Sequence, residues 1–232
     1  MKKSEIFKLA EAQRAELLRI RREQGEKVAA IDMKQLEEVT SAWLQLQPQE
    51  ETESAAGLLN AFQAMYTAAA SEQPFSEALL NEWHKILYAG TPDGIRTGYR
   101  EDLGYDAATQ YTLPAAEELD HLMGHLENQM VNSKALMHPL EYAAMCYKRI
   151  LDIRPFREGN EYTAALLLNF VLRQEGYVCM AIAPTKRTVL LEIIQASRKM
   201  TNPDIDSLPK LIAEGLTQEQ QKYLELLDSD KE

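Results

Sequence analysis

A short break between two strongly helical segments constrains the fold of this chain more than any other feature. The residues that follow His138-Pro139 carry an apolar stripe at helical spacing, with proline at the first helical position. Pro155 and Gly159 interrupt this helix, and a second apolar helix is expected over residues 161–175. A proline and a glycine between two buried helices force a tight loop, and because the chain is helical almost throughout, the sequence predicts an all-α fold.

The rest of the chain is also predicted to be mostly helical. Residues 1–70 are expected to form an N-terminal helical extension, in which one helix begins at the N-cap residue Asp32 and runs to residue 46. The acidic and polar run Gln49–Ser54 is expected to be an internal linker. Residues 71–232 are expected to form the core domain, where Ser76 caps another helix.

Residues 89–114 differ from the helical remainder of the chain. Glycines and a proline recur through this segment, at Gly90, Pro92, Gly94, Gly98 and Gly104. Such residues end helices and favour turns, so we expect a loop with at most a short β-hairpin.

Charge and hydropathy exclude several classes of function. The net charge of −11 disfavours binding to nucleic acid or to an anionic membrane, although residues 1–28 carry a net charge of +3. The longest nearly apolar stretch, Ala164–Leu172, is about half of the roughly 20 residues that span a bilayer. No signal-peptide pattern precedes the first helix, and Cys146 and Cys179 have the surroundings of reduced core thiols. We therefore expect a cytoplasmic protein.

The loop before the second central helix is the strongest candidate for chemistry. Gly159-Asn160 begins a helix whose first N–H groups have no intrahelical partner, and such an end favours phosphate. Glu158, one residue earlier, could hold a divalent metal through its carboxylate. The alternative is that these residues serve only to cap the helix, because most helix starts bind nothing but water or a cap.

Around this loop the chain resembles the Fic (Fido) family, whose signature is His-Pro-Phe-x-(Asp/Glu)-Gly-Asn-Gly-Arg-x-x-Arg. The corresponding segment here reads Arg154-Pro155-Phe156-Arg157-Glu158-Gly159-Asn160-Glu161-Tyr162-Thr163-Ala164-Ala165. The flanks resemble the family too, in the order Trp83-His84-Lys85-Ile86-Leu87, Gly98-Tyr99-Arg100, Pro114, and His138-Pro139-Leu140. This likeness extends over roughly residues 71–215. It implies a Fic-like core domain, an all-α helical bundle around a central helix-loop-helix motif with a short β-hairpin flap.

The resemblance implies a protein adenylyltransferase fold, which passes AMP from ATP to a hydroxyl of a target protein. In that family ATP, or another nucleotide, binds with Mg²⁺ on the motif loop, and the target docks on the flap by strand addition. The implied positions are Arg154 at the general base, Phe156, Arg157, Gly159, Asn160, Glu161 and Tyr162 around the nucleotide phosphates, Glu158 at the metal, and Tyr111, Thr112 and Leu113 on the flap.

This sequence departs from the signature at the positions that carry out the reaction, the general base and the phosphate-binding residues. Arg154 replaces the basic histidine, and its guanidinium stays protonated, so it cannot accept a proton from a target hydroxyl. Tyr162 and Ala165 replace the two arginines that grip phosphate, and Glu161 replaces a glycine and adds negative charge. Loss of a general base alone removes a factor of about 10² to 10⁴ in rate.

The sequence therefore predicts a degenerate Fic-fold protein that lacks ordinary AMP transfer. One interpretation is that it retains nucleotide or phosphate binding, or altered transfer chemistry, because Glu158, Gly159 and Asn160 persist. The alternative is a catalytically inactive scaffold for protein interaction. The flap segment Tyr105–Leu113 has strand-forming tyrosines but also two alanines, so a plain surface loop is equally expected there. His121 and His125 lack a partner at metal-ligand spacing.

Overall fold

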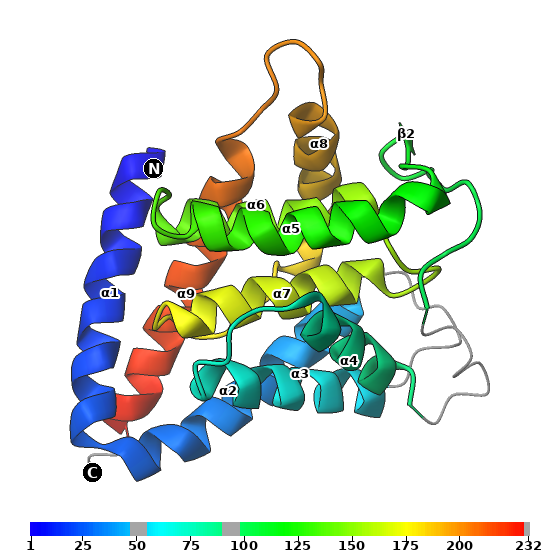
Figure 1. The fold of residues 1–232 in the computed structure, drawn as a ribbon. Helices are drawn as coiled ribbons and strands as arrows, with labels where there is room; N and C mark the ends of the chain where they lie inside the picture. The colour runs from blue at the N-terminus through cyan, green and yellow to red at the C-terminus, as the bar shows by residue number, and fades with distance from the viewer. Residues whose placement is uncertain (47–54, 90–97, 230–232) are drawn as a thin grey trace.

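The computed structural model describes residues 1–46, 55–89 and 98–229, which form the helices shown in Figure 1. The α-helices are α1 (Lys3–Glu23), α2 (Gly25–Leu46), α3 (Ala55–Ala70), α4 (Glu77–Leu87), α5 (Leu119–Ser133), α6 (Pro139–Ile153), α7 (Asn160–Gln174), α8 (Arg187–Ser197) and α9 (Ser207–Ser229). The described part also contains the short 3-10 helices η1 (Ala116–Glu118) and η2 (Pro184–Lys186) and the strands β1 (Tyr105–Asp106) and β2 (Tyr111–Thr112). The predicted all-α class is confirmed.

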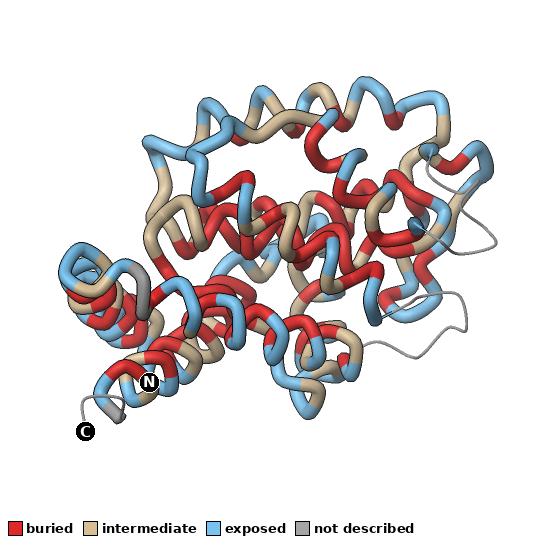
Figure 2. The backbone as a smooth tube through the Cα atoms, turned by 90° about the horizontal axis from the view of Figure 1, so that it is seen from below, coloured by how far each residue is buried: buried red, intermediate tan, exposed pale blue. Residues whose placement is uncertain are grey.

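Helix α7 lies at the centre of the fold. All of its residues from Tyr162 to Leu172 are buried, as expected for a helix whose surface is apolar nearly all round. Helix α6 packs against it from one side and α3 and α4 from another, so that α7 lies between two layers of helices (Figure 1). The buried residues accordingly gather in the middle of the molecule (Figure 2).

Local capping signals begin two of these helices where the sequence predicts. The hydroxyl oxygen of Ser76 accepts a hydrogen bond from the Leu79 N–H at 3.2 Å, which caps α4. At the start of α6, Nδ1 of His138 accepts from the Leu140 N–H at 3.2 Å, and Pro139 occupies the first helical position. His138 therefore has a structural role.

The N-terminal helix α1 packs along α9, so the first and last helices of the chain lie side by side (Figure 1). Gln13, which interrupts the apolar face of α1, is buried in this contact. Its amide nitrogen donates to the Thr217 carbonyl at 3.3 Å, and its amide oxygen accepts from Gln220 at 3.2 Å. The polar interruption is thus a hydrogen-bonded contact between helices.

The expected start of the second helix at Asp32 is wrong, because α2 begins at Gly25. Asp32 lies inside the helix and is buried. Its carboxylate accepts hydrogen bonds from Tyr66 of α3, from Tyr223 of α9 at 2.7 Å and from Arg173 of α7 at 2.9 Å. The side chain therefore joins four helices instead of capping one.

The predicted hairpin is present in the segment before α5. Strands β1 and β2 pair antiparallel, with Tyr105 opposite Thr112 and Asp106 opposite Tyr111. Leu113 follows β2, and its N–H donates to the Gly104 carbonyl at 3.0 Å. We refer to residues 104–113 as the flap. A Cβ at Gly104 would lie 2.4 Å from the end of the Leu113 side chain, so a larger residue there would displace Leu113.

Two earlier expectations concern residues outside the described ranges. The proposed linker 49–54 lies wholly outside them, as does the glycine-rich part of the loop at 90–97. Within the described residues, no helix combines the length and the apolar character that crossing a membrane requires.

Candidate functional site

The motif loop connects the end of α6 to the start of α7. Arg154 ends α6 in the left-handed conformation, with φ 43°, and the following Pro155 prevents the helix from continuing. Gly159 also has a positive φ, of 71°, and a Cβ there would lie 2.7 Å from the Tyr88 hydroxyl. Glycine is therefore needed at this position for both conformation and space.

Asn160 closes the motif loop with its side-chain amide. Its Oδ1 accepts from the Phe156 N–H at 3.0 Å, while its Nδ2 donates to the Phe156 carbonyl at 2.8 Å. The Thr163 N–H donates to the Gly159 carbonyl at 2.9 Å and completes the first turn of α7. Asn160 thus has a clear structural role in shaping the loop.

Helix α4 supports the motif loop from behind through His84. The imidazole stacks on the Phe156 ring with centroids 3.6 Å apart, and Nε2 lies 3.1 Å from the Glu158 carbonyl oxygen. As the carbonyl only accepts, Nε2 is the donor. Burial lowers the pKa of His84 to about 4, although the hydrogen bond to Glu158 acts in the opposite direction. His84 is therefore neutral near pH 7.

Arg100 joins the flap to the motif. Its Nε donates to the Arg154 carbonyl at 2.9 Å, and its terminal nitrogens donate to the carbonyls of Asp102 at 2.7 Å and Pro114 at 2.6 Å. Its backbone N–H donates to the Pro155 carbonyl at 2.9 Å. Burial lowers the pKa of this guanidinium. The sequence indicated Arg100 only as part of a family-like flank, without this role.

An ion pair spans the motif at the position of the expected general base. The Arg154 guanidinium lies 2.7 Å from the Glu161 carboxylate and 3.7 Å from the carboxylate of Asp106 in β1. Both members of the first pair are departures from the family signature. The two substitutions therefore compensate each other electrostatically, which sequence reasoning did not predict.

The other predicted site residues are distributed around the loop. Arg157 is exposed, while Glu158 is half-buried and its backbone carbonyl lies against His84. Tyr162 is 3% exposed and belongs to the hydrophobic core.

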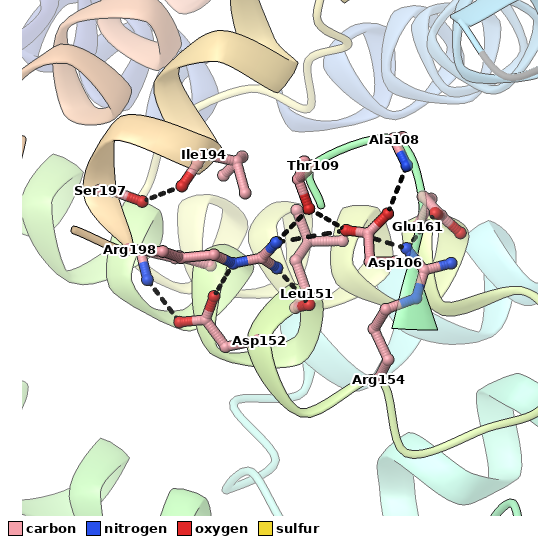
Figure 3. A network of polar contacts seen from close by, with 11 residues as sticks. Asp106, Ala108, Thr109, Leu151, Asp152, Arg154, Glu161, Ile194, Ser197 and Arg198 are labelled. Atoms are coloured by element: carbon pink, nitrogen blue, oxygen red, sulfur yellow. Dashed lines mark hydrogen bonds and ion pairs between the residues drawn. The ribbon is translucent and has the colours of Figure 1, made fainter. Parts of the chain in front are cut away.

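A polar network fixes the flap beside the motif (Figure 3). Arg198, at the end of α8, donates to Asp106 of the flap at 3.2 Å and to Asp152 of α6 at 2.8 Å. Burial alone would raise the pKa of Asp106, but the hydrogen bond from Thr109 and the charges of Arg154 and Arg198 outweigh it and hold this pKa below its usual range. The sequence offered no signal for Arg198, because its partners are distant in the chain.

A cavity of about 50 Å³ lies between the motif, the flap and α8. Its polar lining comprises Asp106, Thr109, Arg154, Glu161, Arg187 and Arg198. Ligand pockets usually enclose roughly 300–1,000 Å³. Cavities of about 410 and 320 Å³ lie elsewhere on the molecule, but no motif residue lines them.

Among the described residues, the cavity beside the motif does not accommodate ATP in this arrangement. The cavity is too small for a nucleotide, and the Glu161 carboxylate places negative charge at the first turn of α7, where phosphate would lie. The Arg154 guanidinium is already engaged by Glu161. Glu158 carries the kind of carboxylate that holds Mg²⁺ together with substrate phosphates.

The remaining predicted residues belong to the flap or to other surfaces. Tyr111 packs its ring over the Arg198 guanidinium at 4.1 Å, Thr112 is exposed, and Leu113 is 7% exposed. His121 and His125 are exposed on α5, with ring centroids 6.4 Å apart. Residues 1–46, 55–89 and 98–229 contain no group of three or more His, Cys, Asp or Glu side chains that could hold a metal.

The segment that contains the motif and the flap matches a known protein family. Residues 74–172, which include α4, the flap and the whole motif, match the model of the Fic/DOC family. Residues 74–172 are therefore similar to a Fic/DOC domain. The resemblance predicted from the motif and its flanks is confirmed.

The curated relatives match only in part. The protein adenylyltransferase Fic of Aedes aegypti is 33% identical over 87 residues, which are 37% of this chain and 17% of that protein. The chain thus spans less than a fifth of the length of this relative.

Solved structures share the fold at low sequence identity. A Fic-domain-containing signaling protein from Bacteroides thetaiotaomicron has a TM-score of 0.78 at 17% identity, covering 94% of this chain and 96% of its own. IbpAFic2 in complex with adenylylated Cdc42 has a TM-score of 0.59 at 16% identity, covering 81% of this chain and 62% of its own. At these identities the comparison establishes the fold alone.

Proposed function

We propose that this chain is a degenerate Fic-fold protein that does not transfer AMP by the ordinary route of its family. The observation that carries the proposal is the ion pair between Arg154 and Glu161. It combines a group that cannot act as a general base with a carboxylate at the start of the helix that would hold phosphate. Both features oppose the chemistry named in the adenylyltransferase relatives.

The small cavity favours an inactive role in which the fold serves as a scaffold for protein interaction. The motif loop is held by Asn160 and His84, and the flap by Arg198, so this face of the molecule presents a fixed shape. We propose that the partner is a protein that contacts the flap. A structural neighbour that holds adenylylated Cdc42 supports a protein partner for this fold.

A second candidate function is retained nucleotide or phosphate binding at the start of α7. Gly159, Asn160 and Glu158 keep the residue types of the signature, and the helix dipole favours an anion at this end. This candidate requires the Arg154–Glu161 pair to separate, because its carboxylate lies beside the place of the phosphate.

A thermal-shift panel separates the two candidates. ATP, GTP, CTP, UTP and ADP are each tested with and without Mg²⁺, because a ligand at 100 times its Kd stabilises a fold by about 2.7 kcal/mol. We expect no shift with any nucleotide. A magnesium-dependent shift that disappears in Glu158→Ala would contradict the scaffold proposal and support nucleotide binding.

The single change Arg154→His tests whether the missing base is the only defect. We expect that it does not restore AMP transfer from labelled ATP, because Glu161 still carries its charge and Tyr162 still lies in the core. Recovery of labelling by this one substitution would show that the rest of the site is intact. Circular dichroism of the variant verifies that the fold is retained.

A further inference from the structure

Arg198 connects three separate elements of the fold through one buried guanidinium. Its side chain is 6% exposed and extends from the end of α8. Toward α6, its Nε donates to Asp152 at 2.8 Å and a terminal nitrogen donates to the Leu151 carbonyl at 2.7 Å. These two contacts fix the guanidinium plane relative to the helix that precedes the motif (Figure 3).

The other edge of the same guanidinium contacts the flap. One terminal nitrogen donates to Asp106 at 3.2 Å and also to the hydroxyl of Thr109, which in turn donates to Asp106. The Tyr111 ring covers the guanidinium face, with its centroid 4.1 Å from the central carbon. Residues of both strands and of the turn between them therefore contact this one side chain.

Little else among the described residues holds the far end of the flap to the body of the protein. The base of the flap is fixed by Arg100, which contacts the carbonyls of Asp102 and Pro114. The two strands are only two residues long each, and a short isolated hairpin is marginally stable in water. The turn is therefore free to move about its base unless Arg198 and Arg154 hold Asp106.

We infer that Arg198 is a latch, a side chain that holds the flap against the cavity beside the motif. Because Arg198 extends from the end of α8, this helix controls access to that cavity. This inference shares with the proposed function only the flap and the cavity between the motif, the flap and α8. Release of the latch removes Asp106 and Thr109 from the lining of the 50 Å³ cavity and opens that cavity toward the flap side. Arg198 is a positioning residue, which acts through the flap.

Hydrogen exchange measured by mass spectrometry tests the latch in the full chain. In Arg198→Gln, we expect amides of residues 104–113 to exchange roughly tenfold faster or more, because the flap loses its charge-assisted hydrogen bonds. Peptides from α7 serve as an internal reference and should remain unchanged. The matched control is Lys199→Gln, which removes the charge of an exposed neighbour and should leave flap exchange as it is.

Thr109→Val provides a milder variant if Arg198→Gln fails to fold. It keeps the side-chain shape and removes only the hydroxyl that links Arg198 to Asp106. Faster exchange confined to the flap supports the latch, whereas unchanged flap exchange in this variant, or equal acceleration in α7 peptides, overturns it. Hydrogen exchange does not measure AMP transfer, so a result that overturns the latch does not contradict the proposed function. Conversely, AMP labelling by the wild type would contradict the proposed function but not the latch.

Discussion

At the scale of single residues, Gly159 is a motif position at which a side chain is strongly disfavoured. Its φ of 71° is unfavourable for any residue with a Cβ, and Tyr88 occupies the space where that Cβ would lie. We expect Gly159→Ala to lower the free energy of unfolding by about 1–3 kcal/mol in urea denaturation. The control Gly124→Ala, inside α5 with no atom near its Cβ position, should be neutral or stabilising.

His84 makes the motif sensitive to acid. Its pKa of about 4 in the fold lies below the ordinary 6.5, so the unfolded chain takes up the proton first as the pH falls. Stability from the neutral imidazole is therefore complete above pH 6.5 and decreases toward pH 4. We expect wild type to lose about 2 kcal/mol more than His84→Gln between pH 7 and pH 5. Equal losses in the two proteins would show that His84 is not the group responsible.

At the scale of elements, the α1–α9 contact depends on polar side chains that a hydrophobic pattern ignores. Gln13 bonds both Gln220 and the Thr217 carbonyl in a buried position. Gln13→Leu would complete the apolar face of α1, yet we expect it to lower the free energy of unfolding by about 1–2 kcal/mol, because Gln220 loses a partner. A higher midpoint in urea for this variant would contradict that account.

Elements with local signals were the ones that the sequence could predict. Ser76 and His138 cap helices through hydrogen bonds to residues only two or three positions away, so their role can be predicted from the local sequence. Asp32 was interpreted as a cap by the same logic, but its partners Tyr66 and Tyr223 lie far along the chain. Distant partners leave no local pattern, which is why the helix start was placed wrongly.

The candidate site also has features that the sequence indicated and features that only the fold reveals. The resemblance to the Fic family indicated the motif residues and the flap, whereas the Arg154–Glu161 pair is formed only when the fold brings its members together. Arg198 was missed altogether, since its contacts with the flap and α6 cross 46 to 92 positions. Charge compensation between substituted positions is visible only in three dimensions.

At the scale of the whole molecule, a buried charge cluster joins the N-terminal helices to the rest. Asp32 of α2 contacts Arg173 of α7 at 2.9 Å and lies 3.8 Å from Arg21 of α1, besides its bonds from two tyrosines. The division of the chain at residue 70 stays a prediction. The contacts across that division nevertheless predict that both parts unfold together.

Neutralising Asp32 tests this coupling. Asp32→Asn leaves Arg173 buried without its carboxylate, so we expect a loss of about 3–5 kcal/mol in the free energy of unfolding. Fluorescence and circular dichroism should still report one transition. Glu38→Gln, an exposed change on the same helix, is the matched control and should be neutral. Two separated transitions in the wild type would show that the parts are independent.

The most direct test of the account as a whole is transfer of labelled AMP from ATP by the unaltered protein. Purified chain is incubated with α-labelled ATP and Mg²⁺, alone and with candidate target proteins, and label on protein is measured after denaturing electrophoresis. We predict no label above that of a Glu158→Ala variant, because Arg154 cannot accept a proton and Glu161 opposes phosphate at the start of α7. Robust labelling of wild type that Glu158→Ala abolishes would contradict the account.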